Sequence, residues 1–135
     1  MYIKLKTLLE LKLKQILHMN YQELEAKVLE WAGDKGILDK ATPMAQANKT
    51  LEELGELHEA LYYQSVGDEK YINSKDVEVN TKEEIIDALG DILVTIIIGA
   101  KLQGLKLENC LESAYNVISK RTGKMVDGVF VKDGN

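Results

Sequence analysis

Residues 42–64 read TPMAQANKTLEELGELHEALYYQ, and this stretch decides the fold. Threonine is a good helix N-cap, and proline is tolerated at the first helical position because its missing N–H has no partner there. Mostly apolar side chains then recur at the spacing of one helix face: Ala47, Leu51, Leu54, His58 and Leu61. The stretch therefore predicts a long amphipathic helix, with His58 as a core or interface residue on its apolar face.

A shorter helix is predicted before it. Asn20 is a good N-cap, and Glu23 stands three residues later, where the second member of a capping box belongs. Gly33 and Gly36 end this helix.

A third helix is predicted to start near Thr81, with Glu84 as its capping-box partner, and to stop at Gly104. The β-branched run at 92–98 also suits a buried strand. The apolar pattern of Ile85, Leu89, Ile92 and Ile96 favours a helix, because it extends over more turns than a strand spans. Since apolar residues surround this helix, it is expected to be buried on several sides.

A fourth helix is predicted over residues 107–121, with Lys106 as a poor cap. Its inward side chains are expected to be Leu107, Leu111, Ala114 and Ile118. Residues 125–130 predict a small β-hairpin with an Asp-Gly turn, whereas the polar residues 65–80 predict a long connecting loop.

The composition is that of one globular domain: 135 residues, 45% hydrophobic and 29% charged. The net charge of −5 is poorly suited to holding a nucleic-acid backbone. The longest apolar run, residues 92–100, is too short to span a membrane, so no membrane partner is expected. The lone Cys110 fits a reducing, cytoplasmic setting.

Residues 1–18 differ from the rest, because they carry four lysines and one acid. They are expected to be an amphipathic extension that packs on the body or on a second subunit; the alternative is that translation starts at Met19. We therefore divide the chain into an extension, residues 1–19, and one domain, residues 20–135.

Acidic residues share one face on each of the two long helices. Gln46, Lys49, Glu53 and Glu56 are spaced three or four apart, and so are Glu84, Asp87 and Asp91. If the helices pack antiparallel, both acidic faces can meet. Such a cluster of oxygen donors favours Mg²⁺ or Mn²⁺. The alternative is a pair of solvated helix faces.

These acids resemble the signature of the MazG-like nucleoside triphosphate pyrophosphohydrolases, which have Glu-Glu-x-x-Glu on one helix and Glu-x-x-Asp on the next. Residues 52–57 (EELGEL) match the first part. Residues 84–87 (EIID) match the second part, and residues 87–93 (DALGDIL) resemble its Gly-Asp context. Further blocks match in order, so that the resemblance covers about residues 20–131: Trp31, Thr42-Pro43, Gln46, Lys49, Ala114-Tyr115-Asn116, Lys120-Arg121 and residues 123–130.

One position departs from the family pattern. If Asp91 is the family aspartate, the family glutamate falls on Ala88, which cannot bind a metal. We expect Asp91 as a ligand, with Asp87 or Glu84 supplying the missing carboxylate. The implied metal site then consists of Glu53, Glu56, Glu84, Asp87 and Asp91.

The resemblance implies an all-α, four-helix bundle-like fold with a small C-terminal β-hairpin. It also implies Mg²⁺-dependent hydrolysis of a (d)NTP between its α- and β-phosphates, which yields a nucleoside monophosphate and pyrophosphate. Glu52 or Glu53 would take the proton of the attacking water. Trp31 would either stack on the base or pack in the core. The expected substrate-binding residues are Gln46, Lys49, Trp31, Asn116, Lys120, Arg121 and Lys124.

A homodimer or homotetramer is expected, because four helices give little cover to an apolar third helix. Two alternatives stay open: an interaction module that kept the scaffold and lost catalysis, which Ala88 favours, and a dUTP-preferring hydrolase of the same superfamily.

Overall fold

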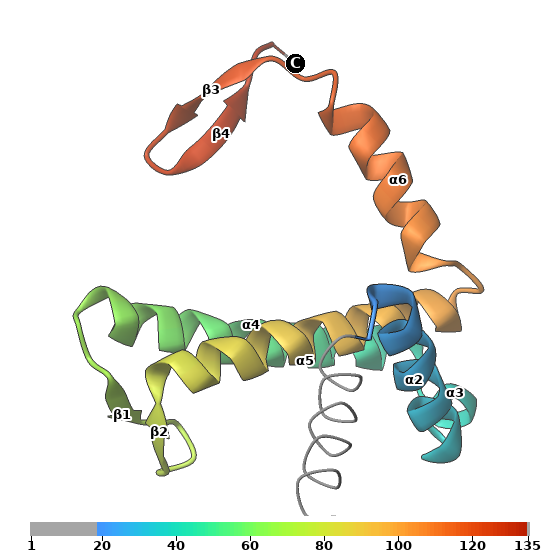
Figure 1. Ribbon diagram of the computed structural model, residues 1–135, viewed down its shortest axis with the longest axis horizontal. Coiled ribbons are helices and arrows are strands. Elements are labelled where there is room, and N and C mark those ends of the chain that lie inside the picture. The colour runs from blue at the N-terminus through green and yellow to red at the C-terminus, as the bar shows by residue number, and fades with distance from the viewer. Residues whose placement is uncertain (1–18, 135) are drawn as a thin grey trace, which may run out of the picture.

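The structure is a computed structural model that describes residues 19–134, so the prediction for residues 1–18 lies outside the described residues. The predicted all-α class with a C-terminal β-hairpin is confirmed (Figure 1). The elements are α2 (Tyr21–Asp34), α3 (Ile37–Lys40), α4 (Pro43–Ser65), β1 (Lys70–Ile72), β2 (Glu78–Asn80), α5 (Thr81–Leu102), α6 (Leu107–Ile118), β3 (Gly123–Val126) and β4 (Val129–Lys132).

The helix starts follow from their caps. The Asn20 side chain accepts a hydrogen bond from the Glu23 N–H at 2.9 Å and donates one to the Glu23 carboxylate at 3.0 Å. The Thr42 hydroxyl accepts from the Ala45 N–H at 3.1 Å, and Pro43 opens α4. These bonds satisfy N–H groups that the first turn leaves without partners, and they confirm the predicted starts of α2 and α4.

The cap of α5 differs from the prediction by one residue. Asn80 is the N-cap, and its side-chain oxygen accepts from the Glu83 N–H at 3.0 Å. Thr81 is instead buried inside the first turn, and its hydroxyl donates to the Asp68 carbonyl at 2.7 Å. Both residue types are good caps, and the bond to Asp68 decides between them.

The predicted loop over residues 65–80 was wrong in part, because it contains the antiparallel hairpin β1–β2. The Asn73 side chain accepts hydrogen bonds from the N–H groups of Lys75 and Val77 and holds the turn. The Tyr71 ring stacks on the Tyr63 ring at a centroid distance of 4.3 Å. This contact joins β1 to the end of α4.

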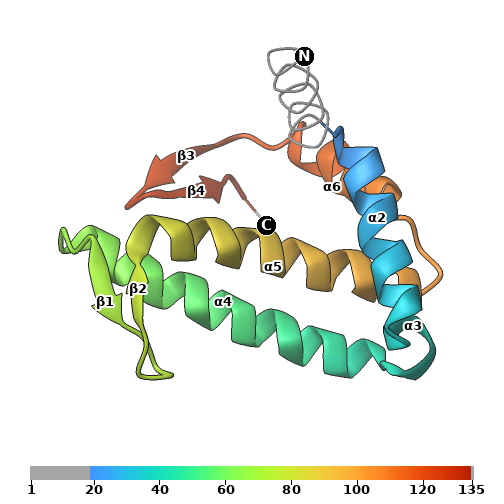
Figure 2. The ribbon, with the colours of Figure 1, turned by 60° about the horizontal axis from the view of Figure 1, so that its bottom comes forward.

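Helices α4 and α5 form an antiparallel pair, and α2 crosses the end of that pair where α5 finishes (Figures 1 and 2). The seam between α4 and α5 is built from small side chains, because Ala60 and Ala88 are buried there. The hydroxyls of Thr50 and Thr95 meet across it at 2.7 Å. The remaining core residues are Ala32, Tyr71, Ile97 and Ile98.

The face of α4 that packs on α5 is not its leucine face. Glu53 is buried in the seam, whereas Leu51, Leu54 and Leu61 are 66%, 49% and 43% exposed. His58 is exposed too, so its prediction as a core residue was wrong for the single chain. On α5 a second apolar row is exposed, at Ile86, Leu89, Leu93 and Ile96, which corrects the expectation that this helix is buried on several sides.

In an antiparallel pair of helices, two side chains lie on the same face of the pair when each is turned from the seam by the same angle about its own helix axis. The two exposed apolar rows therefore form one face of the α4–α5 layer, which we call the apolar face. The opposite side, which we call the acidic face, carries Glu52, Glu56 and Glu59 of α4 with Glu84, Asp87 and Asp91 of α5.

The inward packing predicted for α6 was wrong, because this helix stands away from the α4–α5 layer (Figure 1). Leu111 is 68% and Ile118 51% exposed, Ala114 is exposed, and only Leu107 is half-buried. The β3–β4 hairpin is confirmed, with Asp127 and Gly128 in its turn at φ 49° and 82°. Positive φ at both positions is the geometry that Asp-Gly hairpin turns adopt.

Candidate active site

Glu53 is the centre of the candidate site. Its side chain is 9% exposed, and one carboxylate oxygen, Oε1, lies 3.4 Å from Lys49 Nζ. The other oxygen, Oε2, is buried and has no hydrogen-bond partner among residues 19–134. A buried carboxylate oxygen without a partner is costly unless a cation or a donor reaches it.

Asp91 on α5 faces the same point from across the seam. Burial raises the pKa of Asp91, the charges of Glu53 and Asp87 raise it further, and Lys49 opposes them. Repulsion of this kind requires the carboxylates to be close. Acids of α4 and of α5 therefore border the same seam.

Glu56 lies one turn further along α4. Burial and the neighbouring carboxylate of Glu53 raise the pKa of Glu56, while Lys75 lowers it from a distance of 3.7 Å between Nζ and Oε1. Lys75 comes from the β1–β2 turn. It was not among the predicted site residues, because the sequence gives no sign that the loop folds back onto α4.

A polar cavity of about 180 Å³ opens beside Glu56 between α4, α5 and the β1–β2 hairpin. Burial and the negative charges of Glu84, Glu59 and Glu56 raise the pKa of the Tyr71 hydroxyl in it. Glu84 therefore faces this cavity, whereas Asp87 acts on Asp91. The lining residues are Glu56, Glu59, Tyr71, Asn73, Ser74, Lys75 and Glu84.

The chemistry of these donors fits a hard divalent cation, since they are carboxylates of which one oxygen is buried and without a partner. Ammonium groups approach the acids on both sides, Lys49 near Glu53 and Lys75 near Glu56. Within residues 19–134, no three His, Cys, Asp or Glu side chains are already gathered tightly enough to hold a metal ion. The side chains would therefore have to turn toward the ion.

Ala88 contributes no metal-binding atom to this cluster of acids. It is 3% exposed and packs in the seam. Gln46 is half-buried one turn before Lys49, and its Oε1 is also buried without a partner. Glu52 is on the acidic face, and its carboxylate accepts a hydrogen bond from Lys49 Nζ at 3.3 Å.

The remaining predicted substrate residues are not brought to the acids within the described chain. Trp31 is 48% exposed on α2, so core packing does not explain it. Asn116 is exposed on α6, Lys120 and Arg121 are exposed between α6 and β3, and Lys124 is exposed on β3. These four stand on the part of the chain that is separated from the α4–α5 layer in Figure 1.

Comparisons with known proteins identify the family of the chain. The family model for phosphoribosyl-ATP pyrophosphohydrolase matches residues 36–116, which span α3 to most of α6. The uncharacterized protein YvdC of Bacillus subtilis (strain 168) is 27% identical over 79 residues, which are 58% of this chain and 74% of that protein. No solved structure matches the chain. The match over more than half of the chain shows that it belongs to the phosphoribosyl-ATP pyrophosphohydrolase family, within the MazG-like all-α NTP pyrophosphatase superfamily.

Proposed function

We propose that this protein is a Mg²⁺-dependent pyrophosphohydrolase that cleaves a (d)NTP between its α- and β-phosphates and so serves nucleotide-pool housekeeping. The products are a nucleoside monophosphate and pyrophosphate. The observation that carries the proposal is the buried, unpartnered oxygen of Glu53 beside Asp91 and Glu56. The family match supports a pyrophosphohydrolase activity.

Glu53, Glu56 and Asp91 would hold the metal ion, with Glu84 or Asp87 as a further ligand. When bound, Mg²⁺ (or Mn²⁺) neutralises phosphate charge and lowers the pKa of water. The carboxylates of α4 and α5 would orient the triphosphate, because they project from two rigid helices. A hydrogen bond between two hydroxyls fixes the relative position of these helices.

Glu52 and Lys49 have separate roles in this proposal. The Glu52 side chain is 55% exposed, compared with 9% for Glu53, so Glu52 can accept the proton of the attacking water while Glu53 stays on the metal. The hydrogen bond to Glu52 raises the pKa of Lys49, although burial opposes the shift. Lys49 therefore stays cationic and can stabilise charge on a phosphate.

The family match makes phosphoribosyl-ATP a second candidate substrate, because it carries a triphosphate chain like that of an NTP. A dUTP preference would use the same acids, whereas an interaction module would bind no Mg²⁺ at all. We also propose a homodimer or homotetramer, which the exposed apolar face supports. A cytoplasmic setting is supported by Cys110, which is a free and exposed thiol.

The test measures pyrophosphate release with Mg²⁺ from the canonical NTPs and dNTPs, dUTP and phosphoribosyl-ATP. We expect turnover of at least one of them and its loss in Asp91→Asn. Glu30→Gln is the matched control, because Glu30 is an exposed acid on α2 whose ion-pair partner among residues 19–134 is Lys27. The absence of turnover on every compound, with Mg²⁺ binding absent in calorimetry, would support the interaction module instead.

A further inference from the structure

The C-terminal arm, residues 106–134, is exposed along its whole length except at half-buried Leu107. Large apolar side chains on it are open to solvent, from Val126 at 40% to Leu111 at 68%. A lone two-stranded hairpin is marginally stable in water. The arm therefore needs a surface to cover it, and the described part of the same chain does not supply one.

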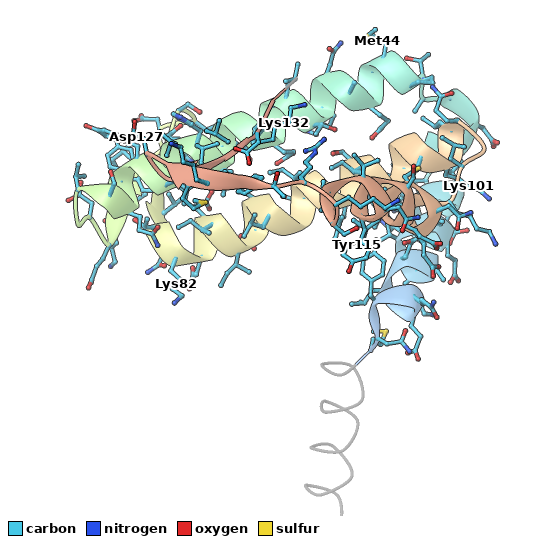
Figure 3. All side chains as sticks on the ribbon, turned by 90° about the horizontal axis from the view of Figure 1, so that it is seen from above. Met44, Lys82, Lys101, Tyr115, Asp127 and Lys132 are labelled. Atoms are coloured by element: carbon cyan, nitrogen blue, oxygen red, sulfur yellow. The ribbon has the colours of Figure 1, made fainter. Side chains whose placement is uncertain are left out.

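The arm rises from the apolar face of the α4–α5 layer. Leu93 and Ile96 of that face line a groove of about 960 Å³ together with Leu107 and Leu111 of α6. From there the hairpin turns back above the layer, as Figure 1 shows. Seen from above, Asp127 and Lys132 project onto the α4–α5 layer (Figure 3).

The length of α6 exceeds the spacing between two packed layers of helices. Its 12 residues span about 18 Å at 1.5 Å per residue. Packed helices lie about 8–10 Å apart, so α6 is long enough to carry the hairpin past one further helix layer. The side chains on both sides of this space are exposed, including Leu89 on α5 and Met125 and Val129 on the hairpin.

The charges of the arm and the acidic face are complementary. The segment after α6 carries Lys120, Arg121, Lys124 and Lys132 against two acids, Asp127 and Asp133. The acidic face carries six carboxylates, and within its own chain it points away from the arm, because the arm rises from the opposite side of the layer.

We propose that the arm embraces a second copy of this chain. The apolar face of the second copy packs on the apolar face of the first, and the hairpin reaches over to the acidic face of that second copy. There Lys120, Arg121 and Lys124 bind the phosphates of the substrate that the acids of the second copy hold. This inference rests on the proposed function, and it makes each site a product of two chains.

Subunit complementation tests the shared site. Glu53→Gln removes a metal ligand, and Arg121→Ala with Lys124→Ala removes cations from the arm. Each variant alone is expected to be inactive. When equal amounts are mixed under conditions of subunit exchange, half of the dimers are mixed and each has one intact site, so about a quarter of wild-type activity should return. No recovery would mean that arm and acids act within one chain.

The control pairs Glu53→Gln with Lys35→Ala, an exposed lysine at the end of α2. Lys35→Ala should be fully active alone. A mixture of Glu53→Gln with Lys35→Ala should give the sum of the two separate activities. A gain above that sum would indicate an effect of mixing other than a shared site.

Photo-crosslinking tests whether the arm contacts a second copy, and it does not depend on an activity assay. A benzoylphenylalanine placed at Val129, and in a second protein at Phe130, is irradiated in a mixture of ¹⁵N-labelled and unlabelled chains. We expect crosslinked peptides that join a labelled to an unlabelled chain, with the acceptor in residues 43–65 or 81–102. Crosslinks only within one isotope class would overturn the embrace, even if the protein hydrolyses nucleotides. Inter-chain crosslinks with no turnover would retain the embrace and reject the activity.

Discussion

The hydroxyls of Thr50 and Thr95 lie 2.7 Å apart across the α4–α5 seam. Each hydroxyl also lies within hydrogen-bond distance of a carbonyl of its own helix, Gln46 at 3.0 Å and Ile92 at 2.7 Å. Each hydroxyl has one proton, so one threonine donates to the other and that other donates to its carbonyl. The pair fixes the relative position of the two helices one turn away from Glu53 and Asp91.

Replacing either threonine by valine should destabilise the protein. Thr50→Val or Thr95→Val leaves one buried hydroxyl with a missing partner, at a cost of about 1–2 kcal/mol. The double variant should lose less than the sum of the single losses, because each single variant already loses the one contact between the two hydroxyls. Urea unfolding of the four proteins measures this coupling. Simple additivity would show that the 2.7 Å contact contributes nothing.

Glu53→Gln should have opposite effects on stability and activity. It removes the negative charge that faces Asp91 and Glu56, so we expect the metal-free protein to melt at a higher temperature. It also removes a metal ligand, so pyrophosphate release should fall by about 100-fold or more. Thermal melts in EDTA and activity assays measure the two effects. A lower melting temperature would show that Lys49 needs the Glu53 charge more than the acids are repelled by it.

Stability should fall as the pH rises through the mildly acidic range. Burial is the main cause that raises the pKa of both Glu56 and Asp91 above the ordinary range of carboxylates. The folded state then binds protons more tightly than the unfolded state, so these groups stabilise it below the unfolded pKa of about 4 and stop doing so as the pH passes the folded pKa. Melting temperatures of the wild type and of Asp91→Asn between pH 4 and 7 in EDTA measure the difference. An identical slope for both proteins would contradict this origin.

Mg²⁺ should offset the cost of keeping these carboxylates charged in the folded protein. At neutral pH, saturating Mg²⁺ is expected to raise the melting temperature of the wild type, since a ligand that binds only the folded state stabilises it. Asp91→Asn should lose most of this shift, whereas the control Glu30→Gln should keep it. If Mg²⁺ still raises the melting temperature of Asp91→Asn, the ion binds at a site that does not include Asp91.

Leu89→Asp should weaken self-association. Leu89 is 54% exposed in the middle of the apolar face, where a carboxylate would be buried by a second copy. Light scattering after gel filtration should find smaller particles than for the wild type. Ile72→Asp is the control, because Ile72 is equally exposed, at 54%, on the β1–β2 hairpin outside this face. Equal masses for all three proteins would exclude the apolar face as the interface.

Local signals in the sequence were sufficient to predict the four longer helices, but the four-residue helix α3 was not predicted. Asn20, Thr42-Pro43 and Asp127-Gly128 act on backbone groups within a few residues, and each predicted its cap or turn correctly. The strands of the β1–β2 hairpin are three residues long, which is too short for a clear alternation. Their position depends on the Tyr63–Tyr71 stack, which joins the strand to the preceding helix and which strand alternation does not reveal.

The sequence predicted which residues share the faces of the candidate site, but not how those faces pack against each other. Spacing identified the faces that carry Glu53 and Asp91. It did not show that the Glu53 face packs on α5 while Leu54 stays exposed, because hydrophobic periodicity reports amphipathicity and not the partner. The contribution of Lys75 was missed for the same reason, since it depends on how a turn folds back.

The small size of the core has a consequence for how this protein is maintained. In residues 19–134, no large side chain is fully buried, and most of the buried residues are alanines, threonines and isoleucines. In the proposed dimer, a chain with so little interior of its own would gain its remaining stability by association, so that folding and assembly would become one concentration-dependent equilibrium. Dilution would then unfold the chain as well as dissociate it, and the level of synthesis would determine the fraction that survives proteolysis.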